Sequence, residues 1–124
     1  MSVAGGGALG ALARHYMTAW VVGVTPDEFP WATALVNIIG CFLLGFAIVV
    51  MSVRPVSAEL RGFATVGLLG AFTTFSTFSQ ETLTLLQAGY YGRASLYVLG
   101  SVGLGLLAVV AGAALASNTV SPTG

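Results

Sequence analysis

Long uncharged stretches, separated by short charged or proline-containing segments, dominate the chain. Residues 29–53 and 62–80 contain no Asp, Glu, Lys, Arg or His, and no charged residue follows Arg93. A helix needs about 20 predominantly apolar residues to cross a bilayer. The pattern therefore predicts three membrane-spanning helices, over residues 31–52, 61–88 and 92–117.

The N-terminal segment is interrupted by Arg14, but residues 3–23 together are long enough for a further span if the guanidinium reaches the headgroups or a partner. A signal peptide would place its positive charge before the apolar run, whereas here the apolar run comes first. We therefore predict an all-α membrane protein of four spans, a single domain over residues 1–124, with both ends on one side of the bilayer.

Composition supports this interpretation and excludes other classes. Hydrophobic residues make up 56% of the chain and charged residues only 6%, against about 25% charged in an average soluble domain. A formal net charge of zero argues against nucleic acid as a partner, since phosphates require a basic surface. The single cysteine, Cys41, excludes an intramolecular disulfide and a multi-cysteine metal site.

The arginines give little bias to membrane orientation. Arg54 and Arg61 follow the second span, and Arg93 precedes the fourth. Excess Lys and Arg normally mark the cytoplasmic side. The small difference here predicts either weakly preferred insertion with the termini inside or insertion in both orientations.

Seventeen glycines indicate close helix contacts, because small residues let helices approach in lipid. Gly6 and Gly10 are four residues apart. Ser101, which follows Gly100, is likewise four residues before Gly105. These pairs fit packing within one subunit or a dimer interface. Four helices enclose little interior, so a path for a solute favours two copies of the chain.

The third span is unusually polar. Between Thr73 and Gln80, six of eight side chains carry a hydroxyl or an amide. Glycines and adjacent threonines weaken a helix, which predicts a break near Gly70–Thr74. Carbonyls freed at such a break suit a hard cation, and freed amides suit an anion. The alternative is a polar helix face bonded to neighbouring helices.

Phenylalanines recur every three residues in this stretch, at Phe72, Phe75 and Phe78. Ring edges carry the positive end of the aromatic quadrupole and can solvate a small anion weakly, although plain aromatic packing gives the same spacing. Asn37, in the uncharged second span, is a second candidate. Polar residues in a span usually face the interior of the bundle, so Asn37 is either a donor to a ligand or a helix–helix hydrogen bond.

Three motifs together resemble one known family. They are Gly70-Ala71-Phe72-Thr73-Thr74-Phe75-Ser76-Thr77-Phe78 followed by Glu81, Gly10-Ala11-x-x-Arg14, and Thr33-x-x-Val36-Asn37-x-x-Gly40-x-Phe42-x-x-Gly45. Their order and spacing are similar to those of the CrcB/Fluc fluoride channels, along nearly the whole chain. The resemblance implies a passive fluoride channel in the plasma membrane of a prokaryote, which exports fluoride and relieves its toxicity.

The resemblance also implies an assembly and a set of site residues. Family members are antiparallel, dual-topology dimers with two pores, formed by the chain with itself or with a second similar chain. A structural Na⁺ at the dimer centre would be held by the carbonyls of Gly70 and Thr73, and Arg14 would serve the vestibule or anchor its helix. The implied pore residues are Asn37, Phe75, Ser76, Thr77, Phe78, Tyr97 and Ser101.

Other function classes have less support in the sequence. A small proton- or cation-coupled exporter of four helices requires a carboxylate near mid-membrane. The one candidate, Glu81, lies toward the end of the predicted third span rather than at its middle. A purely structural assembly subunit needs fewer hydroxyls than the third span carries. An enzyme is not expected, because the sequence offers no nucleophile–base pair and no cluster of metal ligands.

Overall fold

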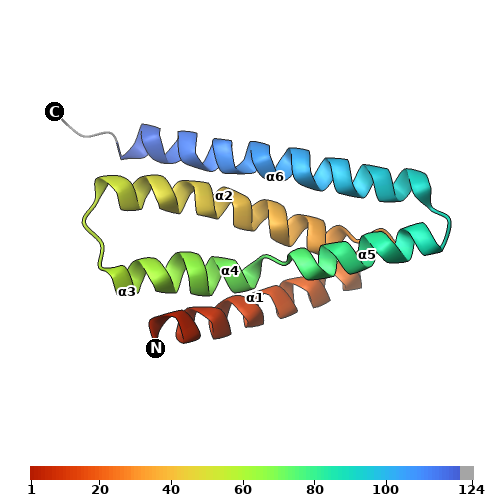
Figure 1. Ribbon diagram of the computed structural model, residues 1–124, viewed down its shortest axis with the longest axis horizontal. Helices are drawn as coiled ribbons and strands as arrows, with labels where there is room; N and C mark the ends of the chain where they lie inside the picture. The colour runs from red at the N-terminus through yellow and green to blue at the C-terminus, as the bar shows by residue number, and fades with distance from the viewer. Residues whose placement is uncertain (121–124) are drawn as a thin grey trace.

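The computed structural model describes residues 1–120, which fold into helices without a strand. The elements are α1 (Ser2–Val24), α2 (Trp31–Val53), α3 (Ala58–Arg61), the π-helix η1 (Gly62–Leu69), α4 (Gly70–Phe72), α5 (Phe75–Gln87) and α6 (Tyr91–Thr119). The run from α3 to α5 extends along the length of the molecule and counts as one crossing (Figure 1). With α1, α2 and α6, the chain therefore crosses the length of the molecule four times. This confirms the predicted all-α, four-helix architecture. The last four residues of the predicted 1–124 domain lie outside the described part.

Two of the described helices, α2 and α6, have the length and apolar composition of a membrane-spanning helix. The third crossing is divided into short elements. Glycines and Arg14 lower the hydropathy of α1. These two crossings therefore lack the uninterrupted apolar character of α2 and α6.

The four crossings lie in a row rather than in a closed square. Figure 1 shows α6 against α2, α2 beside the third crossing, and α1 on the far side of that crossing. The N-terminus and the end of α6 lie at the same end of the molecule as α3 (Figure 1). The α1–α2 and α5–α6 connections lie at the opposite end.

Glycines set how closely these helices approach. Carbon atoms added at Gly6 and Gly10 would collide with the backbone of Phe63 and Leu68 in η1, so this pair packs within the chain. At the α2–α6 contact, Gly45 and Gly112 meet backbone carbonyls of the opposite helix in the same way. Gly100, by contrast, faces open space, and Gly105 makes only ordinary contact with Cys41.

The third crossing departs from regular α-helix twice. η1 is a π-helix, and the Gly70 N–H after it donates to the Thr65 carbonyl, five residues back. The chain is again helical over Gly70–Phe72. Extended backbone follows at Thr73 (ψ 155°) and Thr74 (φ −148°, ψ 115°). The break therefore lies at the C-terminal end of the predicted stretch, and Gly70 itself is helical.

Candidate functional site: the break in the third crossing

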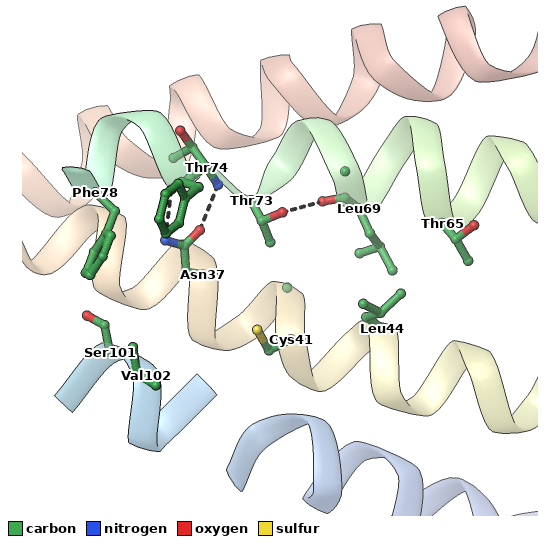
Figure 2. Close-up of a pocket in the computed structure, with 13 residues that line it drawn as sticks. Asn37, Cys41, Leu44, Thr65, Leu69, Thr73, Thr74, Phe78, Ser101 and Val102 are labelled. Atoms are coloured by element: carbon green, nitrogen blue, oxygen red, sulfur yellow. Dashed lines mark hydrogen bonds between the residues drawn. The ribbon is translucent and has the colours of Figure 1, made fainter. Parts of the chain in front are cut away.

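A cavity of about 330 Å³ lies beside this break, between α2, α6 and the third crossing. We call it the break cavity. Figure 2 shows Asn37 and Cys41 reaching it from α2, and Ser101 and Val102 from α6. Its lining includes six of the residues predicted for the pore or the cation: Asn37, Gly70, Thr73, Phe75, Phe78 and Ser101.

Asn37 holds the interrupted segment by its backbone. The Thr74 N–H donates to Asn37 Oδ1 at 2.8 Å, and Asn37 Nδ2 donates to the Thr74 carbonyl at 3.1 Å (Figure 2). A buried backbone amide without a partner costs about 1–3 kcal/mol, so this pair replaces bonds that the helix gives up. A side-chain amide has two N–H donors. The second one has no protein partner among residues 1–120.

The break also frees backbone carbonyls of their helical donors. In a continuous α-helix the Gly70 carbonyl would accept from the Thr74 N–H, and the Thr73 carbonyl from the Thr77 N–H. The first of these amides donates to Asn37 instead, and the second donates to Thr74 Oγ1 at 3.3 Å. The two carbonyls predicted to hold a cation are thus among the four, of residues 70–73, that the end of α4 leaves without helical donors.

Thr74 also begins the next helix. Its hydroxyl caps α5 by accepting from the Thr77 N–H, and it donates to Thr77 Oγ1 at 2.9 Å. The same oxygen lies 3.5 Å from the hydroxyl of Ser76. Threonine is a favourable cap because it satisfies an amide of the first turn that has no helical partner. The hydroxyls of Thr74, Ser76 and Thr77 therefore form one connected group at the start of α5.

The two predicted pore phenylalanines are neighbours. The ring centroids of Phe75 and Phe78 are 5.8 Å apart with an interplanar angle of 40°, and Phe78 continues to Tyr97 at 5.0 Å. Phe78 is half-buried, whereas Phe75 is 79% exposed in the single chain. Apart from its contact with Phe78, the Phe75 ring is therefore left largely uncovered by residues 1–120.

Ser101 supplies an unusual donor. Its hydroxyl oxygen is buried and has no hydrogen-bond partner among residues 1–120. Figure 2 shows it on the α6 side of the break cavity, near Phe78. Buried polar groups are nearly always paired, so an unpaired hydroxyl on a cavity wall is available to a ligand.

Glu81 is held by two helices at once. Thr33 on α2 donates to Oε1 at 2.8 Å, and Tyr97 on α6 donates to Oε2 at 2.6 Å. Tyr97 is fully buried, and its hydroxyl points to this carboxylate. Because α5 continues to Gln87, Glu81 lies in the middle of that helix. The carboxylate thus ties α5 to its neighbours.

A second cavity of about 230 Å³ lies on the α1 side, and we call it the Arg14 cavity. Arg14 and Glu81 line it together with the hydroxyl side chains of Thr18, Thr33 and Thr77. Thr74 lines both cavities, so the linked hydroxyls of Thr74 and Thr77 lie between them. Arg14 is half-buried here, a position suited to the predicted vestibule.

Not every predicted pore residue faces the break cavity. Tyr97 lines a mainly apolar pocket between α2 and α6, which Ser101 also borders. Ser76 is exposed and meets the site only through Thr74. Among residues 1–120, no group of three or more His, Cys, Asp or Glu side chains could hold a metal ion. The oxygens available to a cation at the break are neutral ones: backbone carbonyls and the hydroxyl and amide oxygens of the lining residues.

Sequence reasoning missed the roles of Thr33 and Thr74. Thr33 is four residues before Asn37, one turn along the same face of α2, and this spacing could have indicated a shared polar face. Thr74 was grouped with the other hydroxyls of the third span. Its position before Phe75, with Thr77 three residues on, is typical of a helix cap.

Comparison with known proteins adds to this geometry. A family model described as CrcB-like protein, Camphor Resistance (CrcB), matches residues 1–113. The chain belongs to the CrcB family. The matched range includes α1 to α5, the break and most of α6.

Several similar CrcB relatives carry the name fluoride-specific ion channel FluC. One such protein of Thermus thermophilus is 51% identical over 105 residues, which cover 85% of this chain and 83% of the relative. The protein of Hahella chejuensis is 50% identical, covering 91% and 90%. That of Stutzerimonas stutzeri is 47% identical, covering 93% and 94%. These names describe ion channels and not enzymes.

Proposed function

We propose that this protein is a passive, selective fluoride channel that carries the ion out of the cytoplasm and relieves its toxicity. The observation that carries the proposal is the break cavity, where a free amide N–H of Asn37 and the unpaired hydroxyl of Ser101 accompany two phenylalanine rings. The names of the CrcB relatives agree with it.

Fluoride holds its hydration shell tightly, so a pore must offer replacement donors without binding the ion too strongly. Neutral N–H and O–H donors and ring edges meet this requirement, because conduction needs sites that an ion can also leave. No Arg, Lys or His is among the residues that line the break cavity. Arg14, in the neighbouring cavity, would offset the negative charge of Glu81 there and so let anions approach Thr77 and the break.

We further propose an antiparallel dimer, of the chain with itself or with a similar chain, in the plasma membrane of a prokaryote. Phe75, 79% exposed in the single chain, would be covered by the partner. The row arrangement (Figure 1) leaves a face of the third crossing uncovered by its own subunit. The weak arginine bias suits insertion in both orientations.

A sodium ion at the dimer centre fits the oxygens available. The Gly70 and Thr73 carbonyls have lost their usual helical donors, and unwound backbone carbonyls are known Na⁺ ligands in membrane proteins. Two chains would contribute four such oxygens. When bound, the ion would fix the two breaks against each other, which is a structural role.

Fluoride efflux from liposomes that contain only this protein tests the proposal. A potassium ionophore balances charge, and chloride-loaded liposomes serve as the control. We expect rapid loss of fluoride with chloride retained. Loss of both anions at similar rates would contradict selectivity. No efflux from the protein alone, and none after addition of a similar chain, would contradict channel function.

A further inference from the structure

Gly40 makes the tightest contact between α2 and the break. It is buried, and a carbon atom added at its Cα would collide with the Thr73 Cγ2 methyl and lie 3.4 Å from Phe72 Cδ1. The methyl therefore occupies the space that a side chain at position 40 would fill. Gly40 is one turn from Asn37 on α2, so two successive turns of this helix contact two successive residues of the break.

Moving the Thr73 methyl out of this space would break a hydrogen bond of the Thr73 side chain. Its hydroxyl donates to the Leu69 carbonyl at 3.0 Å (Figure 2). Its backbone N–H donates to the same oxygen at 3.1 Å. Rotation about χ1 would move the methyl only by giving up the hydroxyl bond. With the side chain held, a larger residue at position 40 would push the Thr73 backbone away from α2.

We infer that Gly40 is a positioning residue for the cation: by seating the Thr73 methyl, it fixes where the Thr73 carbonyl lies relative to that of Gly70. Asn37 completes the arrangement, because it holds the Thr74 backbone on the other side of that carbonyl. Gly40 itself offers no side chain to any ion. This inference rests on the proposed Na⁺ site and names the residue that sets its geometry.

The spacing of the two carbonyls decides the fit of the ion. Oxygen ligands hold a hard cation at distances set by its size, and a displacement of a few tenths of an ångström changes how many of them reach it. A shift of the Thr73 carbonyl would occur in both subunits of a dimer. A methyl added at position 40 is therefore expected to displace two of the ligands of each bound ion, one from each subunit.

Binding of radioactive sodium to the purified protein in detergent tests this inference without measuring flux. Gly40→Ala is expected to weaken sodium binding about tenfold or more, equivalent to about 1.4 kcal/mol. Gly103→Ala is the matched control, since it makes the same change in a membrane-spanning helix at an exposed site with no atom within 4 Å. It is expected to bind sodium as the unmodified protein does.

Thr73→Ser gives a test that is specific to this contact, because it removes the methyl and keeps both the hydroxyl and the carbonyl. Alone, it leaves a gap beside Gly40 and is expected to weaken sodium binding. Combined with Gly40→Ala, the gap is filled, and binding should be tighter than with Thr73→Ser alone. Such non-additivity is the signature of two residues in direct contact. If Gly40→Ala alone fails to fold, the double variant can still be compared with Thr73→Ser.

The outcomes separate this inference from the proposed function. Equal sodium affinity of Gly40→Ala and the unmodified protein would overturn the inference, as would a double variant that binds no more tightly than Thr73→Ser. If the unmodified protein bound no sodium while still conducting fluoride, the cation site would be refuted and the inference with it, but not the channel. Thermal unfolding in sodium-free buffer should differ little between the unmodified protein and the double variant.

Discussion

Asn37 and Thr74 exchange two hydrogen bonds across the gap between α2 and the third crossing, at 2.8 and 3.1 Å. The Asn37 side chain thereby supplies the hydrogen-bond partners that a continuous helix would supply to the Thr74 backbone. This relationship pairs both backbone groups of Thr74. Gly70 and Thr73, whose carbonyls lose their helical donors, line the break cavity, and irregular backbone within a membrane is tolerated where it lines a cavity. Asn37 therefore has two roles at once: it binds the Thr74 backbone, and it offers its second N–H to a ligand in the break cavity.

Asn37→Asp keeps one of the two bonds to the Thr74 backbone and removes every donor of the side chain. The carboxylate can still accept from the Thr74 N–H, but it cannot donate to the Thr74 carbonyl or to an anion, and it adds negative charge to the cavity. We expect fluoride efflux to fall by about tenfold or more, as for the loss of one hydrogen bond of about 1.4 kcal/mol. Liposome efflux measures the effect. Asn118→Asp, on the exposed end of α6, is the matched control and should conduct normally.

Replacing either ring, by Phe75→Ile or Phe78→Ile, should sharply reduce fluoride flux while the protein still folds as a dimer. Isoleucine keeps the apolar volume roughly but has no ring edge. Efflux and size-exclusion chromatography report the two properties separately. Phe46→Ile, at a half-buried position on α2 that lines none of the described cavities, controls for general repacking. Normal flux in both ring variants would refute the proposed role of the ring edges.

Tyr97→Phe removes the hydroxyl that donates to Glu81 and keeps the ring against Phe78. Hydrogen bonds to charged groups contribute about 1.5–3 kcal/mol, so the melting temperature should fall clearly. Tyr91→Phe, at an exposed position, should leave it unchanged. Thr33→Val removes the other donor, and the two losses should not be additive because both act on one carboxylate. Additive losses would show that the two bonds are independent.

Two buried glycines of α6 make a matched pair for stability. A methyl at Gly112 would collide with the backbone carbonyl of Phe42, whereas at Gly105 it would meet Cys41 Sγ at 3.6 Å, an ordinary contact. Gly112→Ala should therefore destabilise the α2–α6 contact by about 1–3 kcal/mol, and Gly105→Ala should be nearly neutral. Thermal unfolding in detergent distinguishes them. Equal effects would mean that α6 can shift freely along α2.

The number of crossings could be predicted because lipid requires long uncharged helices, and charged residues mark their ends. The break could also be predicted, since threonines and glycines weaken a helix at a known place. Its exact position could not, because Asn37 is 37 residues before Thr74 in the chain, and only their meeting in space selects Thr73 and Thr74 over Gly70. The π-helix before the break likewise has no local signal in the residues of η1.

Part of the candidate site could be predicted from the sequence in the same way. Residues that share one stretch of sequence, such as Phe75 and Phe78, line one cavity, and their role in a pore stays a prediction. Thr33 was not, because its role depends on a carboxylate 48 residues away. Tyr97 was expected to face the pore, but its ring is fully buried and its hydroxyl is engaged by Glu81. Whether it contacts the ion stays a prediction.

The break brings together two helix ends of opposite polarity: the carbonyl end of α4 and the amide end of α5. A helix end carries roughly half an elementary charge, so one interruption provides a negative pole and a positive pole side by side. Peptide dipoles, unlike carboxylates and imidazoles, neither gain nor lose protons. Charge stabilisation at the break is therefore the same in acidic and neutral surroundings, and acidification would leave it intact.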